Sequence, residues 1–250
     1  MDEREAEGLL RTDAERQAAE AYARIFADSP DSIGTKLQHF VKYVRRQDLT
    51  RFLARYEVFK RVLDVKGSVI ECGVYRGFGL MAWAQFSAIL EPNNLTRRIY
   101  GFDTFAGFPE IGDEDRNRYR TPAAGDLHAG VHEELVELIR IFDQNRFLGH
   151  VAKVELVKGD ARETIPAFIR ERPHLVVSLL FLDFDLHAPT KVALEHFVPR
   201  IPKGGIIAFD ELDNPIWPGE TQALLGTFGV RNLRLRRAEF DPYIAYAVVE

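Results

Sequence analysis

The chain has 250 residues, of which 46% are hydrophobic, and carries a formal net charge of −5 at pH 7. These values fit one large domain with its own core, and they argue against a nucleic-acid partner held mainly through its phosphates. No run of eighteen apolar residues suggests a membrane span, and the charged first 22 residues are unlike a secretory signal. The single cysteine, Cys72, excludes an intrachain disulfide and fits a reducing, cytoplasmic location.

Residues 1–64 are predicted to be helical. Asp13 is a candidate cap for the first helix, Ser29-Pro30-Asp31-Ser32 interrupts the pattern, and two further helices follow. Each helix carries an apolar stripe at helical spacing, which is typical of a packing surface. We expect residues 1–64 to form a helical cap, and because three stripes exceed what one domain edge covers, we also expect a homo-oligomer.

From residue 65 onward, strands and helices alternate, which is typical of a parallel sheet with helices on both faces. The predicted strands are 68–73, 99–103, 154–160, 175–183, 205–211, 232–237 and 243–249. The predicted helices are 80–90, 133–147, 163–171, 188–199 and 219–228. The fold class is therefore α/β and Rossmann-like, with a mainly parallel seven-stranded sheet in a domain that spans 65–250.

The turn after the first strand has the composition of a ligand-binding loop. Glu71-Cys72-Gly73 ends the strand, and Gly77 and Gly79 follow before the next helix. Glycines let a backbone approach a ligand, and the following helix offers its unpaired N–H groups. The spacing differs from the G-x-G-x-x-G of dinucleotide sites, and Glu71 would repel a pyrophosphate. The turn favours a ligand with a cationic or amino-acid-like end over NAD; the alternative is an ordinary strand–helix turn.

Each of the first five predicted strands ends in an acidic residue. Because the carboxyl ends of parallel strands meet at one edge of a sheet, these side chains are expected at a ligand site. At the second strand, Asp103 stands where a ribose diol is held in such folds, and Asp160 could accept a hydrogen bond from an exocyclic amine such as that of adenine. The five strand ends are Glu71, Asp103, Asp160, Asp183 and Asp210-Glu211.

The acids of the fourth and fifth strands have no ribose or base to bind. Asp183, Asp210 and Glu211 offer only oxygen ligands, which suit a hard divalent cation such as Mg²⁺. Such an ion would chelate two neighbouring hydroxyl groups of an acceptor and lower the pKa of one of them. The alternative for Asp183 and Asp185 is strand termination and capping of the next helix.

Residues 104–132 form a connection that is too long and polar for a simple turn, so we expect a lid over the acceptor. His128 and His132 lie in or beside this lid, and His187 follows the fourth strand. These histidines are candidate general bases, and Asp185 is a further candidate for this role.

The segment 211–221 contains two prolines and one tryptophan, so we expect a stiff loop at the same edge. Trp217 would either present its ring to a sugar or fill a hydrophobic gap under the loop. Glu220 would either cap the next helix or touch the acceptor.

The motifs VIECGVYRG, YGFDTFAGFP, KGDA, LDFDLHAPT and GGIIAFDEL occur in this order within residues 65–225. In sequence and spacing they resemble the macrocin O-methyltransferase (TylF/MycF) family. The resemblance implies a class I methyltransferase fold, S-adenosylmethionine and Mg²⁺ as cofactors, and methylation of sugar hydroxyls of natural products.

The resemblance also implies roles for residues. Glu71 and Gly73 would meet the methionine part of the cofactor, with Asp103 at the ribose and Asp160 with Ala161 at the adenine. The implied cofactor contacts are Glu71, Gly73, Tyr75, Gly77, Asp103, Thr104, Asp160, Ala161 and Asp183. The implied metal ligands are Asp183, Asp210 and Glu211, and the candidate catalytic residues are Asp183, Asp185, His187 and His128.

Two departures from the family pattern lie in or beside the acceptor pocket. In the first, Glu211 stands where the family has aspartate. In the second, the stretch that ends at residue 190 has LDFD in place of the family's LDGD, and residues 187–190 in place of its Tyr-Glu-Ser-Thr stretch. We therefore expect an acceptor that differs from a macrolide sugar.

The leading interpretation is a Mg²⁺-dependent O-methyltransferase that uses S-adenosylmethionine on a small hydroxylated, glycosidic acceptor of secondary metabolism. The alternatives are an N-methyltransferase for an amino sugar, an NAD(P)-dependent oxidoreductase, and a non-catalytic cofactor-binding protein. We expect neither a nucleic acid nor a membrane as a partner.

Overall fold

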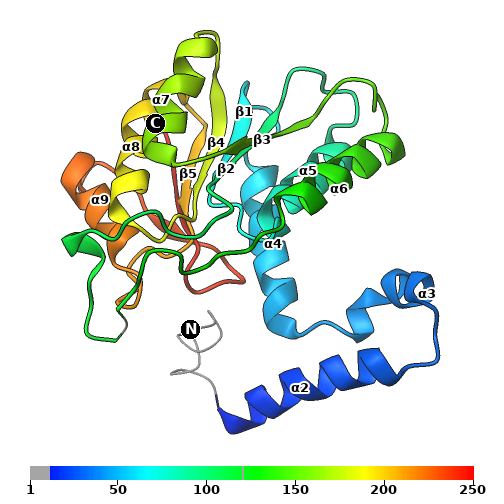
Figure 1. The fold of residues 1–250 in the computed structure, drawn as a ribbon. Coiled ribbons are helices and arrows are strands. Elements are labelled where there is room, and N and C mark those ends of the chain that lie inside the picture. The colour runs from blue at the N-terminus through cyan, green and yellow to red at the C-terminus, as the bar shows by residue number, and fades with distance from the viewer. Residues whose placement is uncertain (1–11, 120) are drawn as a thin grey trace.

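The computed structural model describes residues 12–119 and 121–250, and Figure 1 shows the course of the chain. The strands are β1 (Ser68–Cys72), β2 (Ile99–Asp103), β3 (Val154–Lys158), β4 (Val177–Leu182), β5 (Ile206–Phe209), β6 (Arg236–Arg237) and β7 (Ala245–Val248). The α-helices are α2 (Asp13–Asp28), α3 (Ile33–Gln38), α4 (Arg46–Lys60), α5 (Phe78–Leu90), α6 (His132–Asn145), α7 (Ala161–Glu171), α8 (His187–Phe197) and α9 (Gly219–Thr227). Short 3₁₀ turns are η2 (Phe40–Lys42), η3 (Asp113–Asp115) and η4 (Val198–Arg200).

The strands form one seven-stranded sheet in the order β3-β2-β1-β4-β5-β7-β6. All neighbouring pairs are parallel except those of β7, which runs antiparallel to both β5 and β6. The predicted seven-stranded, mainly parallel sheet is thus confirmed. The order reverses between β1 and β4, and in such sheets the ligand crevice lies at this switch point.

Helices cover both faces of the sheet because consecutive strand residues point to opposite sides. On β1, Val69 packs in a core cluster with residues of α4, α5 and α6. Its neighbour Ile70 packs in a second cluster with residues of α7, α8 and α9. The central strand β4 is buried along its whole length, as its apolar sequence predicts.

The N-terminal helices divide into two groups. Helices α2 and α3 extend away from the sheet (Figure 1), and α2 has no buried residue. In contrast, α4 packs on α5 and the sheet, with Phe59 and Trp83 stacked at 6.3 Å. Within the predicted cap of residues 1–64, α4 therefore belongs to the three-layer body, and residues 1–11 lie outside the described residues.

Most predicted elements differ from the observed ones only at their ends. The main difference is β6, which pairs with β7 at two positions rather than over the predicted 232–237. Among residues 104–119 and 121–131, which the structure describes between β2 and α6, η3 is the only regular structure, in keeping with the long connection expected there. In the part of the chain that the structure describes, no helix has the length and apolar character that crossing a membrane requires.

Candidate active site

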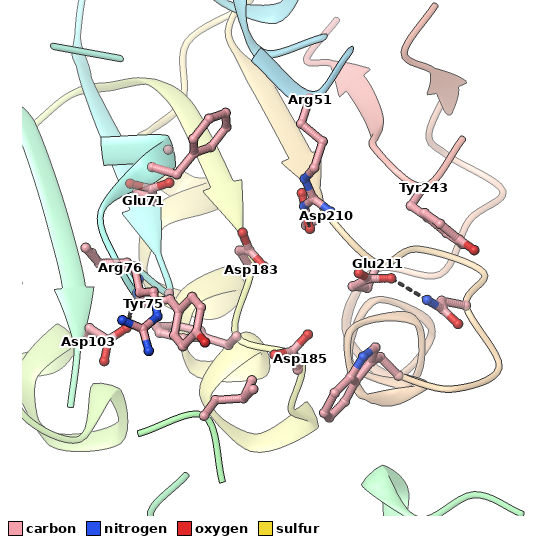
Figure 2. A pocket seen from close by; sticks show the side chains of 18 of the residues that line it. Arg51, Glu71, Tyr75, Arg76, Asp103, Asp183, Asp185, Asp210, Glu211 and Tyr243 are labelled. Atoms are coloured by element: carbon pink, nitrogen blue, oxygen red, sulfur yellow. Dashed lines mark hydrogen bonds and ion pairs between the residues drawn. The ribbon is translucent and has the colours of Figure 1, made fainter. Parts of the chain in front are cut away.

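A cavity of about 670 Å³ opens at the carboxyl ends of the parallel strands. Figure 2 shows that the labelled side chains fall into two groups, with Asp183 between them. Asp103 and Tyr75 lie on the side of β1 and β2, and Asp210 and Glu211 lie on the side of β5. We refer to these sides as the cofactor half and the acceptor half.

The cofactor half is organised by Asp103 at the end of β2. Its Oδ2 accepts hydrogen bonds from the backbone N–H groups of Val74 (2.9 Å) and Tyr75 (2.7 Å), and its Oδ1 accepts one from Phe105 (2.6 Å). Burial raises the pKa of Asp103, and these three N–H groups oppose that shift. A carboxylate has about four lone-pair sites, so capacity for a ribose hydroxyl remains.

The glycines of the β1–α5 turn are required by protein neighbours. Gly73 has φ +97°, and a Cβ there would lie 1.8 Å from the carbonyl oxygen of Asp183. A Cβ on Gly77 would lie 2.3 Å from a side chain of α6, and one on Gly79 would lie 1.8 Å from Oε1 of Glu71. The sequence analysis explained these glycines by the space that a ligand needs. The structure adds a second reason, because a side chain at any of the three positions would collide with the protein itself.

Glu71 and Arg55 bring unsatisfied polar atoms to the buried wall of the cofactor half. Glu71 is 1% exposed, and burial raises its pKa well above the ordinary value while Arg55 acts against that shift. Oε2 of Glu71 and both Nε and Nη1 of Arg55 are buried without a hydrogen-bond partner among the described residues. Because such atoms are costly to leave unpaired, they fit a ligand with ammonium and carboxylate groups, such as the amino-acid end of S-adenosylmethionine.

The other residues predicted to contact the cofactor lie nearby. Thr104, Asp160 and Ala161 line the cavity. Asp160 also caps α7, since its Oδ1 accepts a hydrogen bond from the backbone N–H of Arg162 at 2.9 Å. Its carboxylate further bonds to the Arg162 guanidinium, so this side chain is held in place from two sides.

Two arginines of α4 that sequence reasoning missed bond to the acids at the carboxyl ends of β4 and β5, and one of them, Arg55, also borders the cofactor half. Arg51 forms an ion pair with Oδ2 of the buried Asp210. Arg55 contacts Oδ1 of Asp210 and Oδ2 of Asp183, each at 3.3 Å. Asp210, followed by the other nearby acids, raises the pKa of Arg51 above its ordinary value. The sequence did contain a signal for this pair: Arg51 and Arg55 are four residues apart, and this spacing places both guanidinium groups on one face of a helix.

Two glutamates hold the loops behind these acids. Glu211 accepts a hydrogen bond from the side-chain amide of Asn214, and burial together with Asp210 raises the pKa of Glu211 to about 8. Glu220 is fully buried, and burial raises its pKa too. It accepts hydrogen bonds from the backbone N–H groups of Glu211 (3.2 Å) and Asp185 (3.4 Å), so it ties the β4 and β5 loops together.

The predicted Mg²⁺ ligands do not form a metal site in this arrangement. Among residues 12–119 and 121–250, no group of three His, Cys, Asp or Glu side chains could hold a metal ion. Both carboxylate oxygens of Asp210 and one of Asp183 bond to guanidinium groups. Glu211 bonds to Asn214 instead. A divalent cation would have to compete with Arg51 and Arg55 for carboxylates that these arginines already neutralise, so the arrangement does not fit a resident Mg²⁺.

The candidate bases separate into two groups. Asp183 and Asp185 line the cavity, and Asp185 adopts a left-handed backbone conformation with φ 61°. Strained backbone of this kind clusters at functional sites. His128, His132 and His187 are not among the residues that line the cavity. The three histidines therefore do not face the space in which an acceptor would be deprotonated.

Residues 104–119 dock on the acceptor half through Asp115 and Phe108. Asp115 is 2% exposed, and its Oδ1 accepts a hydrogen bond from the backbone N–H of His187 at 2.6 Å. Phe108 packs edge-to-face on Trp217 at 5.8 Å. Trp217 is 6% exposed, which favours the hydrophobic packing role over an open sugar platform. No sequence pattern links Asp115 to its partner, 72 residues away.

Comparison with known proteins gives this cavity a family context. The sequence model of the family described as Macrocin-O-methyltransferase (TylF) matches residues 42–225. The chain belongs to this family. The resemblance seen in the motifs is thereby confirmed, and the match includes α4 together with the strands and helices up to α9.

Two curated relatives of this chain are named as O-methyltransferases. This chain is 30% identical over 149 residues to the 8-demethyl-8-(2,3-dimethoxy-alpha-L-rhamnosyl)-tetracenomycin-C 4'-O-methyltransferase of Streptomyces olivaceus. It is 29% identical over 155 residues to the mycinamicin III 3''-O-methyltransferase of Micromonospora griseorubida. The alignments cover 59% of this chain and 53% and 56% of the relatives, so the chain spans about half the length of the curated relatives it matches.

Among solved structures, the crystal structure of the calicheamicin methyltransferase CalS11 matches with a TM-score of 0.90 and 36% identity, covering 95% of this chain and 93% of that one. The apo structure of the same enzyme, described as a TDP-rhamnose 3'-O-methyltransferase, matches with a TM-score of 0.83 and 34% identity over 95% of both chains. This similarity extends beyond the family motifs to nearly the whole fold.

Proposed function

We propose that this chain is an S-adenosylmethionine-dependent methyltransferase that methylates a hydroxyl group of a sugar in the biosynthesis of a secondary metabolite. The observation that carries the proposal is the continuous cavity, in which Asp183 lies between a cofactor-type strand end and an acidic acceptor half (Figure 2). Family membership and the activities named for the relatives support the same reaction.

When bound, S-adenosylmethionine supplies a methyl group that its sulfonium has already activated. In our proposal the chain has to bind and orient this cofactor. Asp103 accepts hydrogen bonds from the ribose, and Asp160 and Ala161 contact the adenine. Glu71 and Arg55 meet the amino-acid end, whose charges satisfy the buried polar atoms described above.

At the acceptor half, the chain has to align an oxygen with the methyl group and receive its proton. Positioning supplies much of the rate in such a transfer. We assign the proton to a carboxylate of the β4 end, Asp183 or Asp185, because both line the cavity beside the cofactor half. In this proposal, the residues around Phe108 and Asp115, which contact Trp217 and His187, limit the access of water to this half.

The proposed acceptor is a sugar, either in an assembled glycoside or in a nucleotide sugar. The tetracenomycin relative is named for a rhamnosyl glycoside, whereas CalS11 is named for TDP-rhamnose. We favour the nucleotide sugar, because the similarity to CalS11 extends over nearly all of both chains. An N-methyltransferase for an amino sugar remains an alternative, since these motifs describe the cofactor better than the acceptor.

A Mg²⁺ requirement is not part of the proposal. It was expected from the strand-end acids and from the family resemblance, but the acids bond to arginines of α4. No step of the reaction above depends on a metal ion.

Calorimetric titration and product analysis test the proposal together. We expect S-adenosylmethionine and its demethylated product to bind, and NAD⁺ not to bind. With TDP-rhamnose as acceptor, mass spectrometry should find a product heavier by one methylene unit. Failure of both sulfur compounds to bind would refute the methyltransferase, and tight binding without turnover on any sugar would favour a non-catalytic cofactor-binding protein.

We also propose that the chain forms a homo-oligomer through α2 and α3. Several large apolar side chains of this region are exposed, among them Ile25, Ile33, Leu37 and Phe40. Exposed apolar patches of this kind mark interaction surfaces. Light scattering coupled to size exclusion tests this, and a monomer at micromolar concentration would contradict it. The cytoplasmic location stays a prediction.

A further inference from the structure

Two guanidinium groups of α4 take the place at which a divalent cation was expected. Arg51 bonds to one carboxylate oxygen of Asp210, and Arg55 bonds to the other and to Asp183. Asp210 is 2% exposed. A carboxylate buried this deeply needs a countercharge, and in this structure side chains of the same chain provide it.

The two arginines differ in what they offer to a ligand. The side chain of Arg55 is 3% exposed, and its Nε and Nη1, which have no protein partner among the described residues, are the atoms assigned above to the amino-acid end of the cofactor. The side chain of Arg51 is 28% exposed and lines the cavity. Figure 2 shows Arg51 reaching from α4 down to Asp210, at the side of the cavity opposite Asp103. Since a guanidinium has five N–H donors, Arg51 can bond to Asp210 and to a ligand at the same time.

We infer that Arg51 takes the part of a divalent cation in this chain: it neutralises Asp210 and donates a hydrogen bond to the acceptor oxygen, so that methyl transfer requires no metal ion. This inference rests on the proposed function. A guanidinium keeps its charge over the whole working range of pH, and it favours the negative charge that develops on the attacking oxygen.

The transfer step balances without a metal ion. The acceptor oxygen forms a bond to the methyl carbon while the carbon–sulfur bond breaks, and the electron pair of that bond stays on sulfur. The hydroxyl proton passes to the carboxylate of Asp183 or Asp185. The products are a methyl ether, a neutral thioether and a protonated carboxyl group, which releases its proton to solvent.

Metal binding tests the inference independently of catalysis. The probe is Mn²⁺, titrated into the full chain and followed by electron paramagnetic resonance. We expect the wild type to bind no stoichiometric Mn²⁺, and Arg51→Ala to acquire a site because the carboxylates of Asp210 and Asp183 lose a competing cation. The control is Lys60→Ala, which removes a charge from the exposed end of the same helix and should bind no Mn²⁺.

Turnover of TDP-rhamnose gives the second readout. Wild-type turnover should be unchanged by EDTA, and Arg51→Ala should lower kcat by roughly 100-fold while the dissociation constant of S-adenosylmethionine changes less than about 3-fold. Added methylguanidine should restore part of the lost rate. Arg51→Lys keeps the charge and, if the alanine variant does not fold, provides the same comparison with a smaller loss of kcat.

The outcomes separate this inference from the proposed function. One Mn²⁺ bound per wild-type chain, with turnover lost in EDTA, would overturn the role of Arg51. Unchanged kcat in Arg51→Ala would overturn it too, as would a failure of this variant to acquire Mn²⁺. If S-adenosylmethionine itself does not bind, the proposed function fails, and the Mn²⁺ titration still reports which cation the acids hold.

Discussion

The two halves of the cavity are built in different ways. In the cofactor half, Asp103 bonds to backbone N–H groups of Val74 and Tyr75, which lie 29 and 28 residues earlier, within one strand–helix–strand unit. In the acceptor half, Arg51 meets Asp210 across 159 residues, and Arg55 meets Asp183 across 128. One half depends on a local backbone turn and the other on side chains of distant segments. A methyltransferase can thus keep its cofactor site while its acceptor site changes.

The largest effect is expected at Gly73, where the two halves touch. Gly73→Ala would place a Cβ 1.8 Å from the backbone oxygen of Asp183, at a φ of +97° that favours glycine. We expect a loss of at least about 3 kcal/mol in the free energy of unfolding and no binding of S-adenosylmethionine. Urea unfolding and calorimetry measure both quantities.

The matched control is Gly226→Ala in α9, where a Cβ would meet nothing within 4 Å. An alanine there should be neutral or should stabilise by up to about 1 kcal/mol. If Gly73→Ala bound the cofactor as the wild type does, the close contact between the halves would not be essential.

Next in size is a change confined to the cofactor half. Asp103→Asn replaces a carboxylate that accepts three backbone hydrogen bonds with an amide that can turn its N–H₂ group toward them. We expect the affinity for S-adenosylmethionine to fall roughly 10- to 100-fold, or about 1.4 to 2.8 kcal/mol. Asp64→Asn, at an exposed position, should leave the affinity unchanged. Equal affinities in the two variants would remove Asp103 from the cofactor site.

A smaller effect, restricted to the acceptor half, is expected at Asp115. Asp115→Asn weakens the bond to the backbone of His187 that docks residues 104–119. We expect kcat/KM for the acceptor to fall roughly 5- to 30-fold, which corresponds to about 1 to 2 kcal/mol, with cofactor affinity unchanged. The control is Asp113→Asn in the same 3₁₀ turn, whose side chain is 89% exposed. A loss of cofactor affinity in Asp115→Asn would show that the halves are not independent.

The smallest effect concerns pH. Burial and Asp210 raise the pKa of Glu211 from 4.5 to about 8 in the folded chain, so the folded state holds this proton more tightly than the unfolded state. The stability that Glu211 contributes is full below pH 4.5 and is lost as pH rises to 8. Glu211→Gln should therefore flatten the decline of the melting temperature over this range, whereas the exposed Glu239→Gln should not. Parallel melting curves for wild type and Glu211→Gln would contradict the assignment.

The sequence predicted what depends on local pattern. The alternation of strand and helix patterns predicted the sheet, the strand-ending acids predicted the edge that carries the cavity, and the turn after Glu71 indicated the side that we assign to the cofactor. Sequence reasoning failed where the partner of a group lies far along the chain. The acids of β4 and β5 were found, but their arginine partners on α4 were not, and a metal ion was inferred in their place. Asp115 was missed because only the folded chain brings it to α8.

The position of α4 also matters for engineering. This helix precedes the first strand in the chain, packs on α5, and still reaches the far side of the cavity through Arg51. A segment exchange that replaces residues 40–60 with those of a relative would therefore redesign the acceptor wall as one cassette. The strand–turn–helix unit to which we assign the cofactor would be retained. The two arginines set the condition for such grafts, because a donor helix without them would leave Asp210 buried and without its countercharge.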